Sequence, residues 1–487
     1  MNNLDFVTSD YYFWFLPAVF LCTFVIGNKQ RRRQIAILLV SSYVFFWFAS
    51  GWHVLLLLIS TLVDWNAAKN IHLSNDSKIK KRWLQGALII NLGLLGIFKY
   101  LDFIIETWNW SALRITGAPE IDALGLLLPV GISFYTFQTM SYTIDVYRGK
   151  DEPYDDFLSF ACYAAFFPQL VAGPIVRSGH FRKEIESSLT PSAMRFRLGL
   201  TLIVYGLAKK LIIADNVALH VNTIFEDSSG LNNIGLVWWG AFAFGIQIYC
   251  DFSAYTDIAI GSAYLLGIRL PENFDSPYSA TSPQDFWRRW HISLSTWLRD
   301  YLYIPLGGSK NGPVVLLFAL MGTMLLGGLW HGASWNFVLW GFMHGLLLII
   351  HRTFKDTKPV VNLFEKLPRI SCLLGWAVTQ YFVFMTWLVF RLEDTSLLIP
   401  SLKTYVGIGG HWNISEMNDV LPEVRMLTFA IALIFIIGHF VSWKIGGLKN
   451  WISRQNSVVW GICIGVMLML ALSLRPVETV DFIYFRF

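Results

Sequence analysis

The sequence predicts an all-α protein that crosses a membrane many times. Hydrophobic residues make up 55% of the 487 residues and charged residues only 15%. A soluble domain carries about 25% charged residues, so this chain cannot cover a water-exposed surface of its size. The 21 Trp and 19 Tyr are of the types that concentrate where a membrane meets water. The net charge of +5 is modest and indicates loop charge that sets orientation, not a nucleic-acid surface.

Twelve apolar segments are candidates for the membrane-spanning helices, each of which needs about 20 apolar residues. They lie near residues 11–27, 35–50, 52–67, 84–105, 123–147, 198–217, 234–268, 313–329, 334–350, 371–391, 427–443 and 457–474. No basic region precedes the first segment, so we expect a first span and not a cleaved signal peptide. No soluble domain fits between the segments. We therefore expect one integral membrane domain over residues 1–487.

The distribution of Lys and Arg predicts the orientation of these spans. Segment 218–233 contains neither residue type, and 106–122 contains only Arg114. Because cytosolic loops carry the basic excess, the pattern predicts that both termini face away from the cytosol. The basic segments that it places in the cytosol are 28–34, 75–83, 176–197, 351–370 and 443–455.

Residues 157–175 are apolar but are interrupted by Pro168, Gly173 and Pro174. We expect this stretch to enter and leave the membrane on the same side. Irregular backbone at membrane depth needs protein or water around it, so the stretch also indicates a nearby cavity.

Ionisable side chains at membrane depth are costly and are therefore candidates for function. His331 lies between two strongly apolar runs, beside Trp330, Gly332 and Asn336. Burial disfavours the charged imidazole, and a neutral imidazole can take a proton from a hydroxyl as a general base. The flanking glycines would let a substrate approach the backbone. A structural histidine bonded to a carbonyl is the alternative, and the crowd of glycines, tryptophans and Asn336 favours function.

Residues 285–301 predict a second site on an amphipathic helix. One face of this helix would carry Phe286, Trp290, Leu294, Trp297 and Tyr301. The opposite face carries Arg288, Arg289 and Arg299, with His291 at the border and Trp287 nearby. A plain anchoring helix is one interpretation. The functional interpretation is that the basic face meets an anionic donor while His291 points into a cavity.

Asp251 and Tyr255 interrupt the apolar run at 234–268 and share one helix face. A structural hydrogen-bond network is the simpler interpretation of this pair, and orientation of a catalytic histidine is the alternative.

Ser133 and Gln138 follow Pro129 in a further apolar run. They could line a pocket or serve only packing, and the sequence does not separate these interpretations.

Together these segments resemble the membrane-bound O-acyltransferase (MBOAT) family, in its bacterial alginate O-acetyltransferase-like branch. The segments that carry the resemblance, in order, are 129–148, 166–174, 249–261, 286–308, 328–335 and the closing 482–487. The usual Phe-Asp-Phe-Ser-Gly-Tyr-Ser-Asp of the branch stands here as Cys-Asp-Phe-Ser-Ala-Tyr-Thr-Asp at 250–257. The acidic positions are retained, and the family-like core covers about 120–350, with peripheral spans at 1–120 and 370–475.

The resemblance implies an all-helical fold around a tunnel, with His331 as the catalytic histidine and His291 as the second family histidine. It implies a cytosolic acyl donor, usually acetyl-CoA, and no tightly bound cofactor. The acceptor would be an exported polysaccharide or cell-wall polymer, reached directly or through a periplasmic SGNH-type acetyltransferase partner. The implied location is the inner membrane of a bacterium, among lipids and without nucleic acid.

Known catalytic motifs are absent from the sequence, which contains no G-x-S-x-G elbow, no H-E-x-x-H, no P-loop and no C-x-x-C metal pair. Direct acyl transfer is thus simpler than a covalent acyl-enzyme. A transporter or flippase is an alternative function, although transporters often show matching broken repeats and no matching half is visible. A scaffold for polysaccharide export is a third possibility, but it does not explain a histidine set among glycines in the membrane.

Overall fold

A computed structural model describes residues 5–115, 120–171, 173–226, 231–420, 425–476 and 480–483. Within these ranges the chain is helical, with no named strand, as the sequence predicts. Two parts of the segments that carry the family resemblance, Ala172 and residues 484–487, lie outside the described residues.

The chain folds into two compact units. The first comprises Met1–Ile203 and Ile258–Pro271, and the second comprises Val204–Asp257 and Glu272–Phe487. Helices α10 and α12 each pass from one unit into the other. The expectation of a single domain over 1–487, with its core at about 120–350, stays a prediction.

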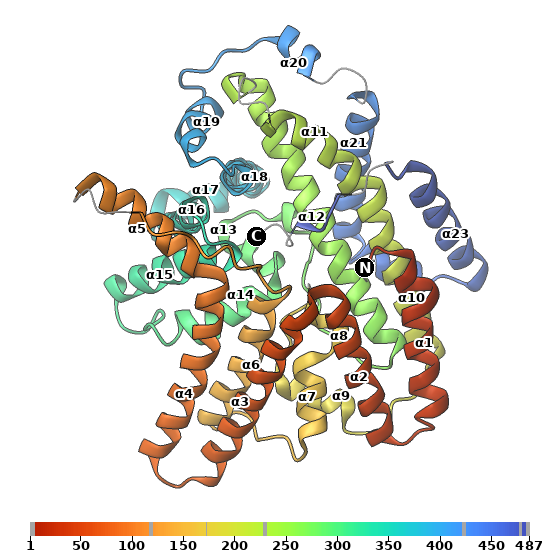
Figure 1. The fold of residues 1–487 in the computed structure, drawn as a ribbon. Helices are drawn as coiled ribbons and strands as arrows, with labels where there is room; N and C mark the ends of the chain where they lie inside the picture. The colour runs from red at the N-terminus through yellow and green to blue at the C-terminus, as the bar shows by residue number, and fades with distance from the viewer. Residues whose placement is uncertain are drawn as a thin grey trace. The chain divides into compact units, whose positions relative to one another are not determined.

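The first unit is built from helices of the N-terminal two-fifths of the chain (Figure 1). Its helices are α1 (Leu16–Leu21), α2 (Arg31–Ser50), α3 (Val54–Leu73), α4 (Ser77–Leu95), α5 (Leu101–Ile115), α6 (Ile132–Tyr147), α7 (Phe157–Ala165), α8 (Phe167–Leu170), α9 (Ser178–Ile185) and most of α10 (Ala193–Ala208). A short 3-10 turn joins α2 to α3, so the predicted spans 35–50 and 52–67 are separate helices.

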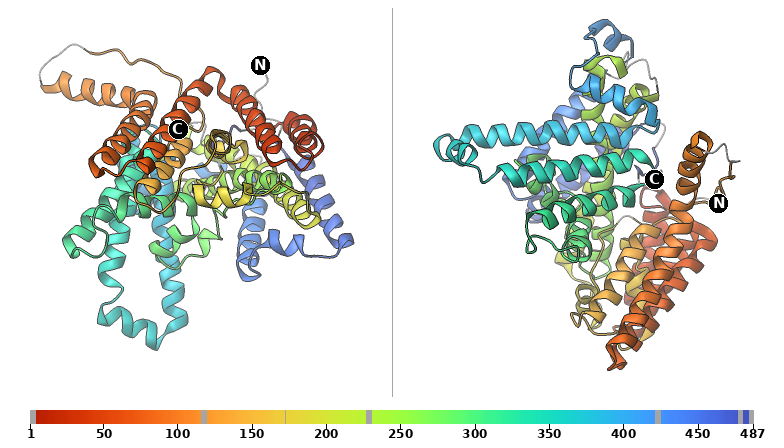
Figure 2. Two further views of the ribbon diagram at one scale, coloured as in Figure 1. Left: turned by 90° about the horizontal axis from the view of Figure 1, so that it is seen from below. Right: turned by 90° about the vertical axis from the view of Figure 1, so that its left-hand side faces the viewer.

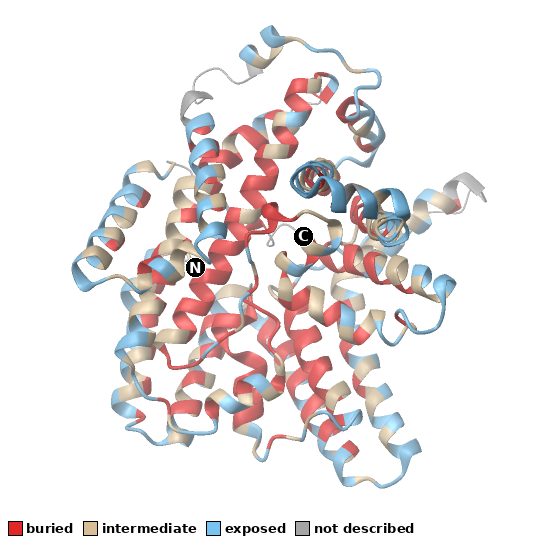
Figure 3. Ribbon diagram, turned by 180° about the vertical axis from the view of Figure 1, so that it is seen from behind, coloured by how far each residue is buried: buried red, intermediate tan, exposed pale blue. Residues whose placement is uncertain are grey.

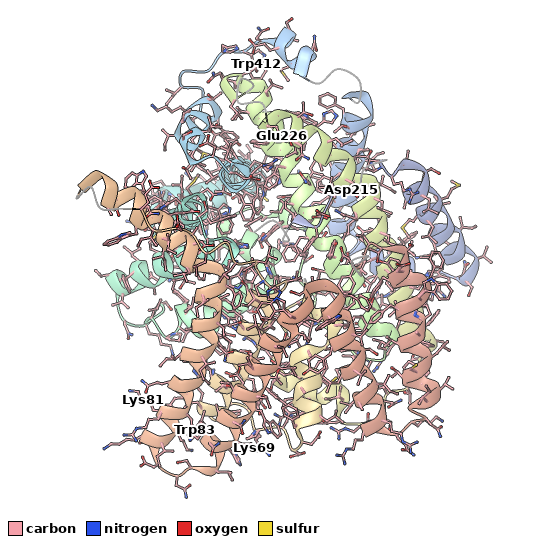
Figure 4. All side chains as sticks on the ribbon, viewed as in Figure 1. Lys69, Lys81, Trp83, Asp215, Glu226 and Trp412 are labelled. Atoms are coloured by element: carbon pink, nitrogen blue, oxygen red, sulfur yellow. The ribbon has the colours of Figure 1, made fainter. Side chains whose placement is uncertain are left out.

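Helices α3, α4 and α6 pack together around a buried carboxylate. Asp64 in α3 is fully buried and accepts hydrogen bonds from Asn91 in α4, at 2.8 Å, and from Thr143 in α6. Interhelical hydrogen bonds of this kind hold membrane helices together where water cannot. Lys69 and Lys81 lie together at one end of the α3–α4 pair (Figure 4). The α1–α2 turn lies at the same end of this unit (Figure 1). The basic loops 28–34 and 75–83 are therefore on one side of the unit, which the predicted cytosolic location of both loops requires.

The predicted span at 123–147 is wrong in its first part. The helix begins only at Ile132, after Pro129, which has no N–H to donate, and Gly131, which has a φ of +73°. Residues 121–128 are exposed and non-helical, and the N–H groups of Leu124 and Gly125 donate to Asp102. An interruption within 157–175 is confirmed, but the first break lies at Phe166, between α7 and α8, and Pro168 stands inside the first turn of α8. The entry and exit of this stretch on one side of the membrane stays a prediction.

The second unit contains the C-terminal half of the chain. Its helices are α11 (Asp215–Glu226), most of α12 (Ile234–Leu265), α13 (Pro283–Arg289), α14 (Ile292–Leu298), α15 (Pro313–His331), α16 (Trp335–Phe354), α17 (Lys358–Lys366), α18 (Pro368–Arg391), α19 (Leu398–Tyr405), α20 (Ile414–Val420), α21 (Arg425–Lys444), α22 (Leu448–Ser453) and α23 (Ser457–Leu474). Helices α15, α16 and α18 run side by side (Figure 2).

Glycines bring the backbones of α15 and α16 into contact. A Cβ on Gly328 would lie 2.2 Å from the carbonyl oxygen of Phe337, and one on Gly341 would lie 2.3 Å from that of Met324. Small residues allow this approach between membrane helices. The two helices are therefore held in a fixed register.

Seven helical segments of the described chain are long and apolar enough to cross a membrane. They are Arg31–Leu73, Ser77–Ala112, Ile234–Leu265, Pro313–His331, Trp335–Phe354, Pro368–Arg391 and Ser457–Leu474, with shorter apolar helices at Tyr11–Ile26 and Thr428–Lys444. The predicted single crossing at 234–268 is one helix of 32 residues, about 48 Å long. Most of its side chains are buried (Figure 3).

Candidate active site

His331 is the last residue of α15 and lies in an aromatic enclosure of the second unit. Its side chain is buried, and its ring centroid lies 4.9 Å from that of Trp340, 5.1 Å from Trp330 and 5.5 Å from Phe390. Charging an imidazole in such apolar surroundings is costly. The enclosure therefore favours the neutral form that a general base requires.

The glycines around His331 have a different role from the predicted one. A Cβ on Gly332 would lie 2.1 Å from the ring of Phe337, and one on Gly327 would lie 3.1 Å from Leu298. These glycines, like Gly328, face packed protein atoms. They make room for neighbouring helices and rings, and the expectation that they open the backbone to a substrate is wrong.

The predicted helix 285–301 is wrong in its middle, because α13 ends at Arg289 and α14 begins at Ile292. His291, between them, has φ +42° and ψ +55°, a left-handed conformation that is uncommon for a residue other than glycine. Backbone strain of this kind gathers at functional sites. The predicted apolar face is nevertheless buried at each of its five positions, Phe286, Trp290, Leu294, Trp297 and Tyr301.

Asn273 fixes the position of His291. The N–H of Ile292 donates to the Asn273 carbonyl oxygen at 2.9 Å, and Ser293 donates its N–H, at 3.1 Å, and its hydroxyl, at 2.9 Å, to Asn273 Oδ1. An oxygen that accepts from Ser293 N–H is an acceptor, so His291 Nδ1, 3.2 Å away, must be the donor. A neutral imidazole protonated at Nδ1 keeps its lone pair on Nε2.

Burial lowers the pKa of His291 to about 3, so the ring is neutral at physiological pH. Its centroid lies 5.7 Å from Trp330, whose indole also contacts His331. The structure thus brings both predicted histidines to one tryptophan, and the three rings form the centre of the candidate site.

A cavity of about 510 Å³ opens beside this centre and is lined by basic residues. Arg288 and Arg299 lie on its wall, together with Arg352 near the end of α16. Arg289 does not line this cavity and instead pairs with Asp285 at 3.0 Å. The cavity thus has the basic wall expected for an anionic ligand, with two of the three arginines on the predicted basic face in place.

The inner wall of the cavity leads toward the two imidazoles. Trp287 and Ile292, the neighbour of His291, line it, as does Met324 on α15. Met324 lies seven residues before His331, which corresponds to about 10 Å along the helix axis. The cavity therefore reaches the residue next to His291, and its lining includes neither histidine.

Asp251 and Tyr255 serve a structural network. Asp251 pairs with Lys210 at 2.9 Å and accepts the N–H of Ile483 at 2.7 Å, and the ring of Tyr255 stacks on Phe482 with centroids 3.8 Å apart. These contacts favour the simpler interpretation over orientation of a histidine.

Lys210 is a buried cation that the sequence did not single out. It also pairs with Asp215, at the start of α11 (Figure 4), at 2.8 Å, and donates to the carbonyl oxygen of Val480 at 2.7 Å. The neighbouring Lys209 pairs with Asp257 at 2.6 Å. Both lysines lie inside the predicted span 198–217. The sequence could therefore have indicated a buried ion cluster here, because charges within a membrane need partners. Together these bonds hold the C-terminal residues 480–483 inside the second unit.

Three other residues of the predicted site make hydrogen bonds within the protein. Gln138 in the first unit donates to the carbonyl oxygen of Tyr163 at 2.8 Å, and Ser133 accepts from Lys99 at 3.3 Å. Asn336, at the start of α16, donates to the carbonyl oxygen of Leu392 at 3.1 Å and so joins α16 to the end of α18.

His344 lies one turn after Trp340 on α16 and was also missing from the predicted site. Its ring lies 4.5 Å from Trp340 and 5.1 Å from Trp287. The hydroxyl of Thr386 donates to the Val383 carbonyl, so its oxygen accepts from His344 Nε2, 3.0 Å away. A histidine within the predicted span 334–350 was the available signal.

A family model and several known proteins are similar to this chain. A family model described as the membrane-bound O-acyltransferase family matches residues 152–392. The chain is 37% identical to a probable alginate O-acetylase of Pseudomonas syringae pv. tomato, over 88% of this chain and 80% of that protein. It is 32% identical to a peptidoglycan O-acetyltransferase of Helicobacter pylori, over 99% and 98% of the two chains. A teichoic acid D-alanyltransferase of Streptococcus thermophilus is 28% identical over 56% of this chain and 70% of its own length.

Proposed function

The chain belongs to the membrane-bound O-acyltransferase family and is a multi-pass membrane acyltransferase, and on that premise we propose that it moves an acetyl group from a cytosolic thioester to a hydroxyl of an exported cell-envelope polymer. One observation carries the proposal: two buried imidazoles flank one indole, close to a basic cavity whose wall includes Ile292, the neighbour of His291. Family membership decides against the transporter and scaffold alternatives.

The basic cavity is the proposed entrance for the donor, acetyl-CoA. Arg288, Arg299 and Arg352 would meet its phosphates, because Arg is well suited to bind phosphate. The cavity also reaches His351 at the end of α16, where the basic segment 351–370 begins, and we place that segment in the cytosol. The donor enters as a substrate, and no tightly bound cofactor takes part.

His331 is the proposed general base. Its neutral ring takes the proton of the acceptor hydroxyl while the hydroxyl oxygen attacks the thioester carbonyl carbon. The C–S bond then breaks, and the thiolate takes the proton from the imidazolium. His291, with its lone pair on Nε2, is the proposed second polar group at the reacting centre. Trp330 fixes the spacing of the two rings.

The relatives suggest the class of acceptor, because alginate, peptidoglycan and teichoic acid are named with them and are polymers that lie beyond the cytoplasmic membrane. We place this protein in a bacterial inner membrane on the same basis. Its largest segment away from the basic loops, about 392–426, is too short for a polymer-binding domain. A periplasmic partner of the SGNH acetyltransferase type, which receives the acetyl group or presents the polymer, completes the proposal.

Reconstitution in liposomes tests the function. Acetyl-CoA with a labelled acetyl group is placed on one side, and alginate or peptidoglycan, each with and without a periplasmic partner, on the other. We expect labelled ester with the wild-type protein and at least a tenfold loss with His331→Ala. The variant should keep the thermal stability of the wild type. Residual transfer above a tenth of wild type would rule out the general-base role, and full-rate polymer acetylation without a partner would rule out the relay.

A further inference from the structure

Buried tryptophan N–H groups in the second unit point to a role in binding the acyl donor. An indole N–H can only donate a hydrogen bond. Among the described residues, no acceptor lies within hydrogen-bond reach of Nε1 of Trp340 or of Trp287. Trp340 is fully buried, and Trp287 is 9% exposed. Leaving a buried donor unpaired costs about 1–3 kcal/mol, and such a group in a native protein calls for an explanation.

The two indoles form a row of ring contacts that runs from the basic cavity to His331. Trp287 lines the cavity, and its ring centroid lies 5.8 Å from that of Trp340. The ring of Trp340 lies 4.9 Å from His331, at an interplanar angle of 78°. A ligand that advances from the cavity toward the base therefore meets Trp287 first and Trp340 next.

The backbone holds Trp340 in place. Its neighbour Gly341 lies in direct contact with α15, where a Cβ would be 2.3 Å from the Met324 carbonyl oxygen. The ring is packed between His331, His344 and Phe390. A donor that cannot move away when charge develops is the kind that stabilises a transition state.

We infer that the N–H of Trp340 donates a hydrogen bond to the acyl carbonyl oxygen of the thioester, and that Trp340 is a catalytic residue beside His331. This inference rests on the proposed function. When the acceptor oxygen forms its bond to the carbonyl carbon, the C=O π electrons move onto the carbonyl oxygen. Trp340 then faces an oxyanion. The oxygen returns its electron pair as the C–S bond breaks, and the proton held by His331 goes to the departing sulfur.

A purely structural role for Trp340 makes a different prediction. An N–H that points at an aromatic ring gains a weak contact, and its loss would lower stability without a specific effect on turnover. An oxyanion donor acts chiefly in the transition state. Its loss therefore lowers kcat and leaves the KM for the acyl donor nearly unchanged.

The test replaces the N–H of Trp340 by sulfur with β-(3-benzothienyl)alanine at position 340, which preserves the ring shape. We expect kcat to fall about 10²-fold, with the KM for acetyl-CoA within threefold of wild type and the thermal midpoint unchanged or raised. The matched control carries the same analogue at Trp376, whose N–H already donates to the Tyr278 carbonyl at 2.9 Å. That control should lose stability and keep its kcat.

The infrared band of a carbonyl-labelled acetyl donor gives a second measurement in the wild type and in the position-340 variant. A lower C=O frequency in the wild type than in the variant supports the bond. A kcat within threefold of wild type, a rise in KM alone, or the same band in both proteins would overturn the inference. If the wild-type protein transfers no acetyl group, the proposed function fails before the variants are compared.

Discussion

Replacing Lys210 with methionine should destabilise the second unit strongly. Lys210 is about 2% exposed and binds Asp215 at 2.8 Å and Asp251 at 2.9 Å, both of which are also buried. It also donates to the Val480 carbonyl oxygen at 2.7 Å. Methionine keeps most of the side-chain volume but leaves two buried carboxylates without their cation. Removing one partner of a buried ion pair costs about 3–5 kcal/mol.

That free energy corresponds to a fall in the thermal midpoint of roughly 5–9 °C for a unit of the size of Val204–Asp257 with Glu272–Phe487. Lys209→Met is the matched control, because Asp257 keeps a second cation, Lys449, at 2.8 Å. We expect the control to lose less than half as much. Exchanging all three charges, as Lys210→Met with Asp215→Asn and Asp251→Asn, should recover most of the loss, since the largest cost of the single change is the uncompensated buried charge that it leaves behind.

A thiol-reactive dye can follow the unfolding of each unit. Cys250 is buried in the second unit and Cys162 in the first, so each is retained alone in a chain whose other native cysteines are replaced by serine. Dye labelling of Cys250 during heating reports the second unit. A midpoint for Lys210→Met within 1 °C of the parent would refute the argument, and so would a triple variant that melts no higher than the single one.

Two further predictions concern His291 and the membrane orientation. The pKa of His291 is about 3 in the folded protein and about 6.5 in an unfolded chain. Between these two pH values the unfolded state binds one more proton than the folded state. The free energy of unfolding should therefore fall by about 1.4 kcal/mol for each pH unit from pH 6.5 down to about pH 3, and should not change with this group above pH 6.5. His291→Gln should lose this component of the acid limb in detergent melts and lose acetyl transfer at pH 7, and an acid limb equal to that of wild type would contradict the buried neutral ring. Single cysteines at Ser77 and Asn232, in a background without native cysteines, should label from opposite sides of the membrane, and labelling from one side would refute the orientation map.

The long apolar helices follow directly from the sequence. Helices α15, α16 and α18 match the predicted spans because nothing but an apolar run is needed to specify them. His331 was found for a related reason, since an ionisable group in such a run is conspicuous. The buried face of 285–301 was also predicted, because the side-chain periodicity survives a break in the helix.

The break at His291 could not be predicted, because a left-handed histidine is imposed by bonds from the distant Asn273. The partners of Asp251 were missed for the same reason. Lys210 precedes it by 41 residues, and Ile483 follows near the C-terminus. Trp340 gave no signal, because a tryptophan in a membrane helix is ordinary until its N–H is found to lack an acceptor.

The buried polar groups of the second unit fall into two classes, according to whether the protein itself supplies their hydrogen-bond or ion-pair partners. Lys209 and Lys210 each bind carboxylates of the same unit, so their interactions are complete without a ligand and their removal should lower stability. Trp340 donates to no described residue, so its N–H contributes nothing to the fold that the benzothienyl analogue would lose. The two classes should therefore respond oppositely: lysine variants should melt early yet retain turnover once folded, and the position-340 variant should melt normally yet turn over slowly. A lysine variant that is stable and inactive would show that the cluster acts in the chemistry as well.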